Sequence, residues 1–188
     1  MSRVISIFSL KGGVGKTSLS FSLSKDLEMG YITNDMSIAI QKHKKSKYVR
    51  NKVPLRDNTI YDFGGFSDNN ANEIIKVSDL LIIPTINDQN SILKTLEVIK
   101  KFSQYVEILV VGTMVENDKD KKNIRKFIAQ KYPDINIICL KKTRAFKNGM
   151  EEGLSLKDLF NSSPLNKHRY KGIYKNYVKF VTEVNHYI

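Results

Sequence analysis

Residues able to carry out chemistry gather first in a short glycine-rich segment that runs from Leu10 to Ser18. Glycines at positions 12, 13 and 15 allow backbone conformations that side chains forbid, so successive amide N–H groups can point at one anion. The ammonium group of Lys16 and the hydroxyl group of Thr17 follow at once, and they suit an anionic oxygen and a Mg²⁺ ion, respectively. The segment therefore predicts a site for phosphate groups and a metal ion.

Two elements must position this segment. The apolar run Val4 to Phe8 is typical of a strand buried on both faces of a parallel sheet. Leu19, Leu23 and Leu27 then recur at helical spacing, and Gly30 is the expected end of that helix. A loop between such a strand and helix lies at the helix N-terminus, where the partial positive charge of the backbone favours anions.

The common phosphate-loop pattern, G-x-x-x-x-G-K-[ST], has a glycine where this chain has Leu10, and this chain adds a second lysine, Lys11. The segment KGGVGKT resembles the deviant Walker A signature K-G-G-x-G-K-[TS] of the ParA/MinD ATPases, and the chain is most similar to small ParA-type partition proteins. This resemblance implies ATP or ADP with Mg²⁺ as ligands. The implied nucleotide-binding residues of the loop are Lys11, Gly12, Gly13, Val14, Gly15, Lys16, Thr17 and Ser18.

The resemblance implies a particular role for Lys11. In this family the extra lysine crosses a dimer interface and contacts the phosphates bound by the partner subunit, so an ATP-dependent homodimer is expected. The alternative is that Lys11 is a solvated lysine of the loop. Lys11 and Lys16 are, by resemblance, two of the three catalytic residues.

A second signal is the apolar strand from Thr59 to Phe63, which carries Asp62 and is followed by Gly64 and Gly65. The resemblance identifies it as the Walker B-like element. It implies that Asp62 and Thr17 hold Mg²⁺ and that the two glycines bring backbone N–H groups to the γ-phosphate.

A third signal is the short strand expected from Tyr31 to Asp35. The resemblance implies that Asp35, the third catalytic residue, positions or activates the attacking water. The surrounding residues depart from the family run D-x-D-P-Q, and an ordinary aspartate at a strand end is the alternative.

Strands and helices alternate through the rest of the chain. Asn87 or Asp88 is expected to cap the helix after the fourth strand, and Pro164 to break the chain before a final helix. The further strands are expected at 80–84, 106–111 and 135–140, and the further helices at 71–77, 118–131 and 169–187. We therefore predict one α/β domain, 1–188, with the fold of the P-loop NTPases: a doubly wound, mostly parallel sheet with helices on both faces. The glycine-rich loop begins only a few residues into the chain, so the N-terminal DNA-binding domain of larger relatives of this family is not expected.

The net charge of +12 indicates a polyanionic partner, since a basic surface binds phosphates and releases counterions. Seven Lys or Arg residues lie between Lys42 and Arg56, where a shortened connection is expected, and they either contact DNA or form a solvated face. Alternatively, the positive net charge reflects a lysine-rich proteome and no polyanionic partner is involved. By resemblance, the candidate DNA-binding residues are Arg144, Lys141, Lys142, Lys147, Lys171 and Lys175. For the basic residues at 141–147, a basic turn beside phosphate or solvent is the alternative.

The resemblance predicts a DNA-partition ATPase that hydrolyses ATP slowly. Its dimer would hold non-specific DNA, and a centromere-binding, ParB-like partner would stimulate hydrolysis and release the DNA. A MinD-like membrane-positioning ATPase, a ligase of the dethiobiotin synthetase kind and a non-hydrolysing nucleotide-binding module are the alternatives. The apolar stripe of the last helix is interpreted as core rather than as a membrane anchor.

The single cysteine, Cys139, is expected to be a packed strand residue, and one cysteine cannot supply the ligands of an iron–sulfur cluster within one chain. The sequence has no leader-like segment and no apolar run of transmembrane length. A cytoplasmic protein is therefore expected, and the DNA binding that the resemblance implies would make it nucleoid-associated.

Overall fold

The computed structural model describes residues 3–50, 52–64 and 69–188. Within them the chain forms a sheet of seven strands in the order β3-β2-β4-β1-β5-β6-β7, and every pairing is parallel. This confirms the α/β prediction. The strands are β1 (Val4–Phe8), β2 (Gly30–Thr33), β3 (Ser46–Tyr48), β4 (Thr59–Phe63), β5 (Leu80–Thr85), β6 (Glu107–Val115) and β7 (Asn136–Lys141).

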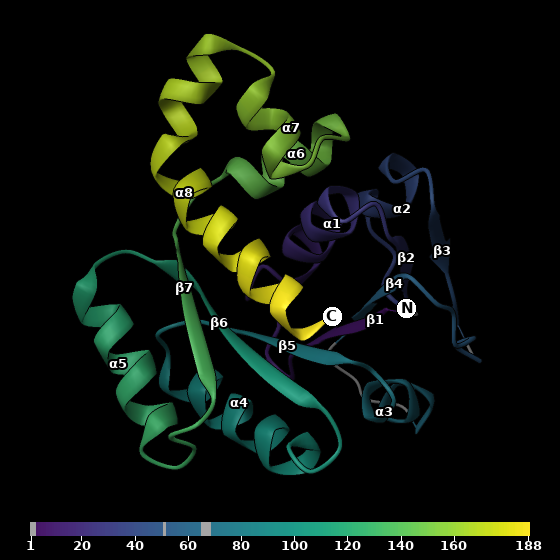
Figure 1. Ribbon diagram of the computed structural model, residues 1–188, viewed down its shortest axis with the longest axis vertical. Helices are drawn as coiled ribbons and strands as arrows, with labels where there is room; N and C mark the ends of the chain where they lie inside the picture. Colours follow the sequence, from purple (N-terminus) through teal and green to yellow (C-terminus); the bar gives the residue numbers. More distant parts are fainter. Residues whose placement is uncertain (1–2, 51, 65–68) are drawn as a thin grey trace.

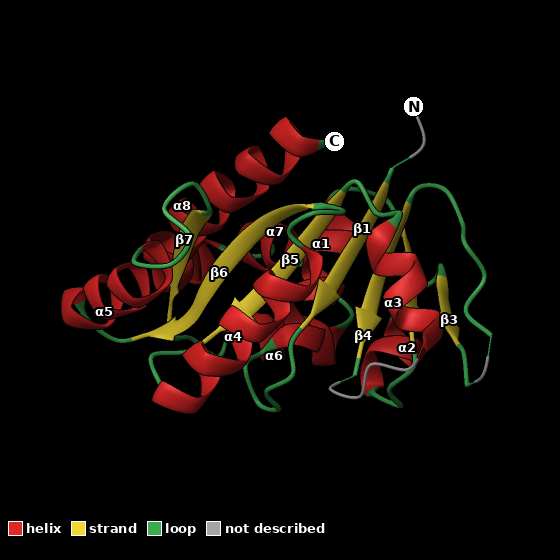
Figure 2. Ribbon diagram, turned by 90° about the horizontal axis from the view of Figure 1, so that it is seen from below, coloured by secondary structure: helices red, strands yellow, loops and turns green. Residues whose placement is uncertain are grey.

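Helices cover both faces of the sheet (Figures 1 and 2). On one face lie α3 (Asn69–Lys76), α4 (Gln89–Phe102) and α5 (Asp118–Ala129). On the other face lie α1 (Lys16–Asp26), α6 (Ala145–Glu152), α7 (Leu156–Asn161) and α8 (Pro164–Tyr187), and the short α2 (Ile38–Lys42) packs beside α1 and α6.

The alternation of side chains along β1 explains why the sheet is covered twice. Val4 and Phe8 belong to the apolar cluster beneath α3, α4 and α5, whereas Ile5 and Ile7 belong to the cluster beneath α1 and α8. A strand with apolar side chains on both faces must be covered on both faces, because only then are all of these side chains removed from contact with water.

The strand order places β1 at the centre of the sheet, between β4 and β5. The chain goes from β1 to one side of the sheet first and to the other side later, so the order reverses next to β1. Ligands of doubly wound sheets bind beyond the carboxyl ends of the strands at such a reversal. The glycine-rich loop leaves the carboxyl end of β1 at this point.

Two predicted boundaries near β2 are wrong. Helix α1 ends at Asp26, and Glu28 takes the left-handed conformation (φ 55°), so Gly30 does not stop the helix. Gly30 instead begins β2, where its N–H donates to the carbonyl of Asn58 (2.8 Å). The strand also ends at Thr33, two residues before Asp35.

The basic stretch from Lys42 to Arg56 contains β3, which the sequence interpretation missed. This strand has three residues and forms the edge of the sheet beside β2. An edge strand needs no apolar run, and lysine is a common residue there because it discourages further pairing. The strand therefore has no hydrophobic pattern that would predict it.

The last helix begins earlier than predicted. Pro164 is its first residue rather than a break before it, and the hydroxyl of Ser163 caps it by accepting from the N–H of Asn166 (3.1 Å). Proline suits the first turn because its missing N–H would have no helical partner there. The predicted cap of α4 is confirmed, since the Asp88 side chain accepts from the N–H of Ser91 (2.9 Å).

The apolar face of α8 packs on the sheet. Ile173, Tyr177, Phe180 and Val184 are buried in the cluster shared with β1 and α1, which confirms that this stripe belongs to the core. Within the described ranges, no helix is both long and apolar enough to cross a membrane.

Candidate functional site

The glycine-rich loop wraps around the N-terminus of α1. Gly13 and Gly15 have positive φ angles of 78° and 76°, which side-chain-bearing residues rarely adopt, and Gly15 leads directly into the helix. Two carbonyl groups of the loop accept hydrogen bonds from neighbouring elements. The Thr113 hydroxyl donates to the carbonyl of Val14 (2.8 Å), and the Lys94 ammonium donates to the carbonyl of Leu10 (3.2 Å). The loop is thereby fixed from β6 and α4.

Lys16 and Asp62 meet at the centre of the site. The ammonium nitrogen of Lys16, in the first turn of α1, lies 2.6 Å from Oδ1 of Asp62 on β4. The Asp62 side chain is completely buried and that of Lys16 is 10% exposed. Because water barely reaches this pair, each charged group is stabilised by the other, and removal of one would leave an unpaired buried charge at a high cost in free energy.

Tyr31 contacts the other oxygen of the same carboxylate. Its hydroxyl, on β2, donates to Oδ2 of Asp62 (2.7 Å), and both side chains are buried. Burial, and then the charge of Asp62, raise the pKa of Tyr31 well above its usual range. The phenol therefore remains a hydrogen-bond donor at physiological pH.

Asn34 and Asp35 follow β2, and Asp35 lines the same cavity as Lys16. The Asp35 N–H donates to the hydroxyl of Thr33 (3.0 Å), and Asp35 itself is exposed. The side-chain oxygen of Asn34 accepts from the N–H of Gly64 (2.6 Å). The amide predicted to approach a γ-phosphate thus has an intramolecular partner in this structure, and the predicted Gly65 lies outside the described residues.

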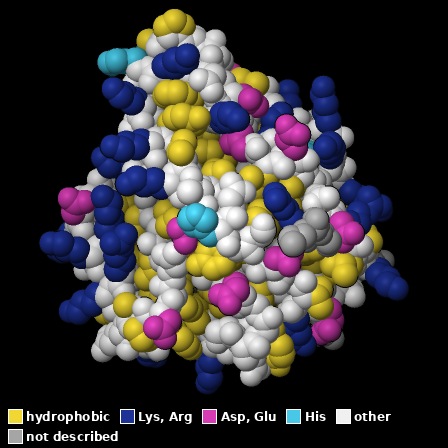
Figure 3. Space-filling model, viewed as in Figure 1, with side chains coloured by type: hydrophobic (Ala, Val, Ile, Leu, Met, Phe, Trp, Pro, Cys, Tyr) yellow, Lys and Arg dark blue, Asp and Glu magenta, His cyan; other side chains and the backbone are white. Residues whose placement is uncertain are grey.

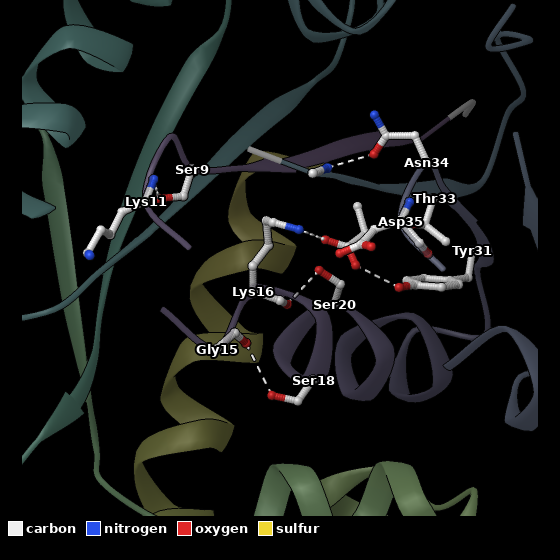
Figure 4. Close-up of polar contacts among 12 residues, drawn as sticks. Ser9, Lys11, Gly15, Lys16, Ser18, Ser20, Tyr31, Thr33, Asn34 and Asp35 are labelled. Carbon is white, nitrogen blue, oxygen red and sulfur yellow. Dashed lines mark hydrogen bonds and ion pairs between the residues drawn. The ribbon is translucent and has the colours of Figure 1, made fainter. Parts of the chain in front are cut away.

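Lys11 points away from this group. Figure 4 shows its side chain extending from the loop on the side opposite Lys16 and Asp35, while its N–H donates to the hydroxyl of Ser9 (3.3 Å). Lys11 and Lys16 therefore reach in different directions from the same loop.

A cavity of about 530 Å³ opens over the loop. Predicted site residues that line it are Lys11, Gly12, Gly13, Val14, Gly15, Lys16, Thr17, Ser18, Asp35 and Gly64. Asp62 lies behind Lys16 and is fully buried. The folding of the chain has therefore brought together residues from β1, α1, β2 and β4.

The apolar part of the far wall of the cavity was not predicted from the sequence. This wall is built by the ends of β6 and β7 and by α6, with an apolar part that consists of Met114, Leu140, Phe146 and Met150. Met114 has a positive φ of 54°, a strained conformation, and it lies within the irregularity between Gly112 and Val115 in the pairing of β6 with β7. Short-range sequence patterns carry no sign of this conformation.

Some predicted DNA-binding residues also lie in this wall. Lys141, Arg144 and Lys147 line the cavity. Lys142 instead pairs with Glu116 at the surface (2.5 Å), and Lys171 and Lys175 are exposed on α8. The candidate set therefore divides into residues at the cavity and residues away from it.

The charges and donors of the cavity suit a nucleoside triphosphate with its metal ion. Its basic side chains are Lys11, Lys16, Lys141, Arg144 and Lys147, and Asp35 is the acidic one among the lining residues. The described residues contain no group of three or more His, Cys, Asp or Glu side chains that could hold a metal ion. The Thr17 hydroxyl and the Asp62 carboxylate fit Mg²⁺, which is usually held by few protein ligands together with phosphates and water.

The parallel sheet has a glycine-rich loop after its central strand, and this loop ends in Gly15, Lys16 and Thr17 at the start of a helix. This arrangement is that of the P-loop NTPase fold. Within that class, the structure is similar to MinD from Pyrococcus horikoshii complexed with Mg-ADP (TM-score 0.69, 16% identity, 98% of this chain and 96% of that one). It is also similar to the ATP complex of a McdA variant from Cyanothece (0.66, 16%, 93% and 96%). A plasmid partition protein from Borrelia burgdorferi is a third similar structure (0.58, 13%, 86% and 99%).

These likenesses establish that the chain has the fold of the ParA/MinD-type ATPases. No family model and no curated protein matches the sequence.

Proposed function

We propose that this protein is a Mg²⁺-dependent ATPase of the ParA type that binds non-specific DNA in an ATP-dependent dimer and serves DNA partition. The observation that carries the proposal is the cavity itself: the loop from Lys11 to Ser18 lies at the carboxyl end of β1, with Lys16 against Asp62 from β4. MinD with Mg-ADP and a McdA variant with ATP are among the similar structures, which supports a nucleotide as the ligand.

The predicted catalytic and metal-binding residues have the following roles in this proposal. Lys16 and the amides of the loop stabilise the negative charge of the transferring phosphoryl group, and Thr17 and Asp62 hold the Mg²⁺ ion, which neutralises phosphate charge. Asp35, exposed in the cavity wall, orients the water that attacks the γ-phosphorus. The bond to the leaving oxygen breaks, and ADP and inorganic phosphate result.

Lys11 makes the proposed dimer depend on ATP. Its side chain extends away from Lys16, so it is free to reach phosphates bound by a second copy of the chain (Figure 4). A second subunit would thus complete each site, and hydrolysis would separate the two.

The basic surface is the proposed site of DNA binding. Lys and Arg side chains follow one margin of the molecule, over α8 and toward α5 (Figure 3). On α8, Lys167, Lys171, Lys175 and Lys179 are exposed at intervals of four residues and so form one row. A ParB-like, centromere-binding partner is proposed to stimulate hydrolysis, and the single domain 1–188 is proposed to act in the cytoplasm on the nucleoid.

A MinD-like membrane-positioning ATPase is the rival function, and MinD is among the similar structures. A terminal amphipathic helix could bind a membrane only if its apolar face were exposed. In α8 this face is already buried against the sheet, which supports DNA rather than lipid as the partner.

The test is binding to random-sequence DNA at two salt concentrations, with ATP–Mg²⁺, with ADP and without nucleotide. Wild type is compared with Lys11→Ala and, as a control, with Lys76→Ala, which removes an exposed lysine at the opposite end of the strands. We expect salt-sensitive binding that needs ATP, is lost in Lys11→Ala and persists in Lys76→Ala. Binding that ignores the nucleotide, or binding to anionic vesicles in place of DNA, would overturn the proposal.

A further inference from the structure

Asp62 has a partner for each of its oxygens. Lys16 occupies Oδ1 at 2.6 Å, and the hydroxyl of Tyr31 occupies Oδ2 at 2.7 Å. Lys16 sits on the first turn of a helix at the edge of the cavity, whereas Tyr31 sits inside a strand and is 0% exposed. The contact with Lys16 can therefore be broken more easily than the contact with Tyr31.

The pairing of the strands fixes the position of Tyr31. Thr33 of β2 lies opposite Asp62 of β4, and Tyr31 lies opposite Ile60. Side chains two residues apart share a face of a strand, so Tyr31 stands on the same face as Asp62 and reaches it diagonally.

The ring of Tyr31 is also held from behind. It belongs to a small buried cluster with Phe21 of α1 and Ala39 of α2, and the ring of His43 lies 5.6 Å from it at an angle of 33°. The hydroxyl therefore cannot leave the carboxylate without disturbing α1, α2 and His43, which directly follows α2.

Tyr61, on β4, provides a contrast. It is equally buried, but its hydroxyl donates to the carbonyl of Pro54 (2.7 Å) and accepts from the N–H of Arg56 (2.8 Å). Tyr61 therefore binds the backbone of the segment that precedes β4, whereas Tyr31 contacts a charged residue of the site.

We propose that Tyr31 is a positioning residue for Asp62: it holds the carboxylate by Oδ2 and leaves Oδ1 to the partner on the side of the cavity, which is Lys16 in this structure. This inference rests on the proposed function, in which Lys16 turns to the phosphates and Asp62 holds the Mg²⁺ ion. Once Lys16 has turned, the bond from Tyr31 keeps the carboxylate at the same place and stabilises its ionised form. Hydrogen bonds to charged groups are among the stronger ones in proteins.

The experiment compares Tyr31→Phe with wild type and with the matched control Tyr61→Phe. Binding of a fluorescent ATP analogue is measured in EDTA and in Mg²⁺, and the ratio of the two dissociation constants gives the affinity that Mg²⁺ adds. Loss of one bond to a buried carboxylate predicts that Tyr31→Phe lowers this ratio about tenfold, with little change of the affinity in EDTA. Tyr61→Phe should keep the ratio of wild type, whatever its melting temperature.

Asp62→Asn supplies the second comparison. If Tyr31 acts through Asp62, adding Tyr31→Phe to Asp62→Asn should leave the ratio unchanged. Should Tyr31→Phe fail to fold, replacement of Tyr31 by 3-fluorotyrosine keeps the ring and changes the strength of the donor, and the ratio should again differ from that of wild type.

The outcomes separate this inference from the proposed function. An unchanged ratio in folded Tyr31→Phe, or equal losses in Tyr31→Phe and Tyr61→Phe, would overturn the role of Tyr31 and leave the ATPase intact. A wild-type protein that binds no ATP analogue would overturn the proposed function itself, and the inference with it.

Discussion

The ammonium nitrogen of Lys16 lies 2.6 Å from Oδ1 of Asp62, and this contact joins the first turn of α1 to β4 inside the protein. Both residues are those that phosphates and Mg²⁺ would need in the proposed function. In the proposed function, nucleotide binding would therefore require Lys16 to exchange the carboxylate of Asp62 for phosphate oxygens. The exchange is between two anionic partners, so the ammonium group is never left without one.

Removal of Lys16 should destabilise the protein even without nucleotide. In Lys16→Ala the fully buried Asp62 loses its cation, and we expect a loss of about 3 kcal/mol in the free energy of unfolding. Urea unfolding measures it. Lys11→Ala should unfold like wild type, and Lys16→Ala/Asp62→Asn should regain most of the loss. If the double variant is as unstable as Lys16→Ala, the ion pair does not stabilise the fold.

The glycines of the loop should differ in their tolerance of alanine. Gly13 and Gly15 have φ angles near +77° (78° and 76°), where a Cβ atom costs about 1–2 kcal/mol, so Gly13→Ala and Gly15→Ala should lower both stability and nucleotide affinity. At Gly12 a new Cβ would meet no described atom within 4 Å, and Gly12→Ala serves as the control for stability. Thermal melts with and without ATP would show the difference, and three equal melting temperatures would contradict it.

Two helical glycines should respond to alanine in opposite ways. At Gly149 in α6 a Cβ would lie 2.8 Å from the carbonyl oxygen of Leu154, so Gly149→Ala should destabilise by about 1–3 kcal/mol. At Gly172 in α8 no described atom lies within 4 Å, and the better helix propensity of alanine should stabilise by about 0.5–1 kcal/mol. Chemical denaturation of each variant measures both effects; a stabilised Gly149→Ala would show that the turn after α6 can give way.

His43 should make the stability depend on pH. Burial, and then the charges of Lys25 and Lys45, lower the pKa of His43 to about 4 in the folded protein, against 6.5 for an ordinary histidine. The unfolded chain therefore binds an extra proton between these values. Neutral His43 makes its full contribution to the free energy of unfolding above pH 6.5. This contribution, at most about 3 kcal/mol, is lost as the pH falls toward 4.

Urea unfolding at a series of pH values tests this prediction. His43→Gln should have a flatter profile between pH 6.5 and 4 than wild type has. The exposed His168 is the control, and His168→Gln should keep the wild-type profile. Identical profiles for wild type and His43→Gln would mean that His43 does not titrate differently on folding.

The two groups of predicted DNA-binding residues should separate in binding measurements. Arg144 and Lys147 line the cavity, so Arg144→Gln and Lys147→Gln should weaken nucleotide binding. Lys171 and Lys175 are exposed on α8, so Lys171→Gln/Lys175→Gln should spare nucleotide binding. Each lost phosphate contact should lower the slope of log K against log salt for DNA by about 0.9. An unchanged slope in the α8 variant would place the DNA elsewhere.

The sequence by itself determined the alternation of strands and helices and the place of the glycine-rich loop. Both are local properties, because a few neighbouring residues are enough to predict them. The apolar run from Val4 to Phe8 and the positive-φ glycines of the loop are examples. Pro164 shows the limit of such signals, because proline both breaks helices and begins them, and only the cap at Ser163 decided which.

Only the tertiary structure decided which distant residues share the site. The bond from Tyr31 to Asp62 depends on the register of β2 against β4, and the placement of Lys141, Arg144 and Lys147 in the cavity wall depends on where β7 ends relative to β1. The edge strand β3 likewise exists because β2 offers it a partner. Such relationships arise when separate strands pair and pack, and no short stretch of sequence contains both sides of the contact.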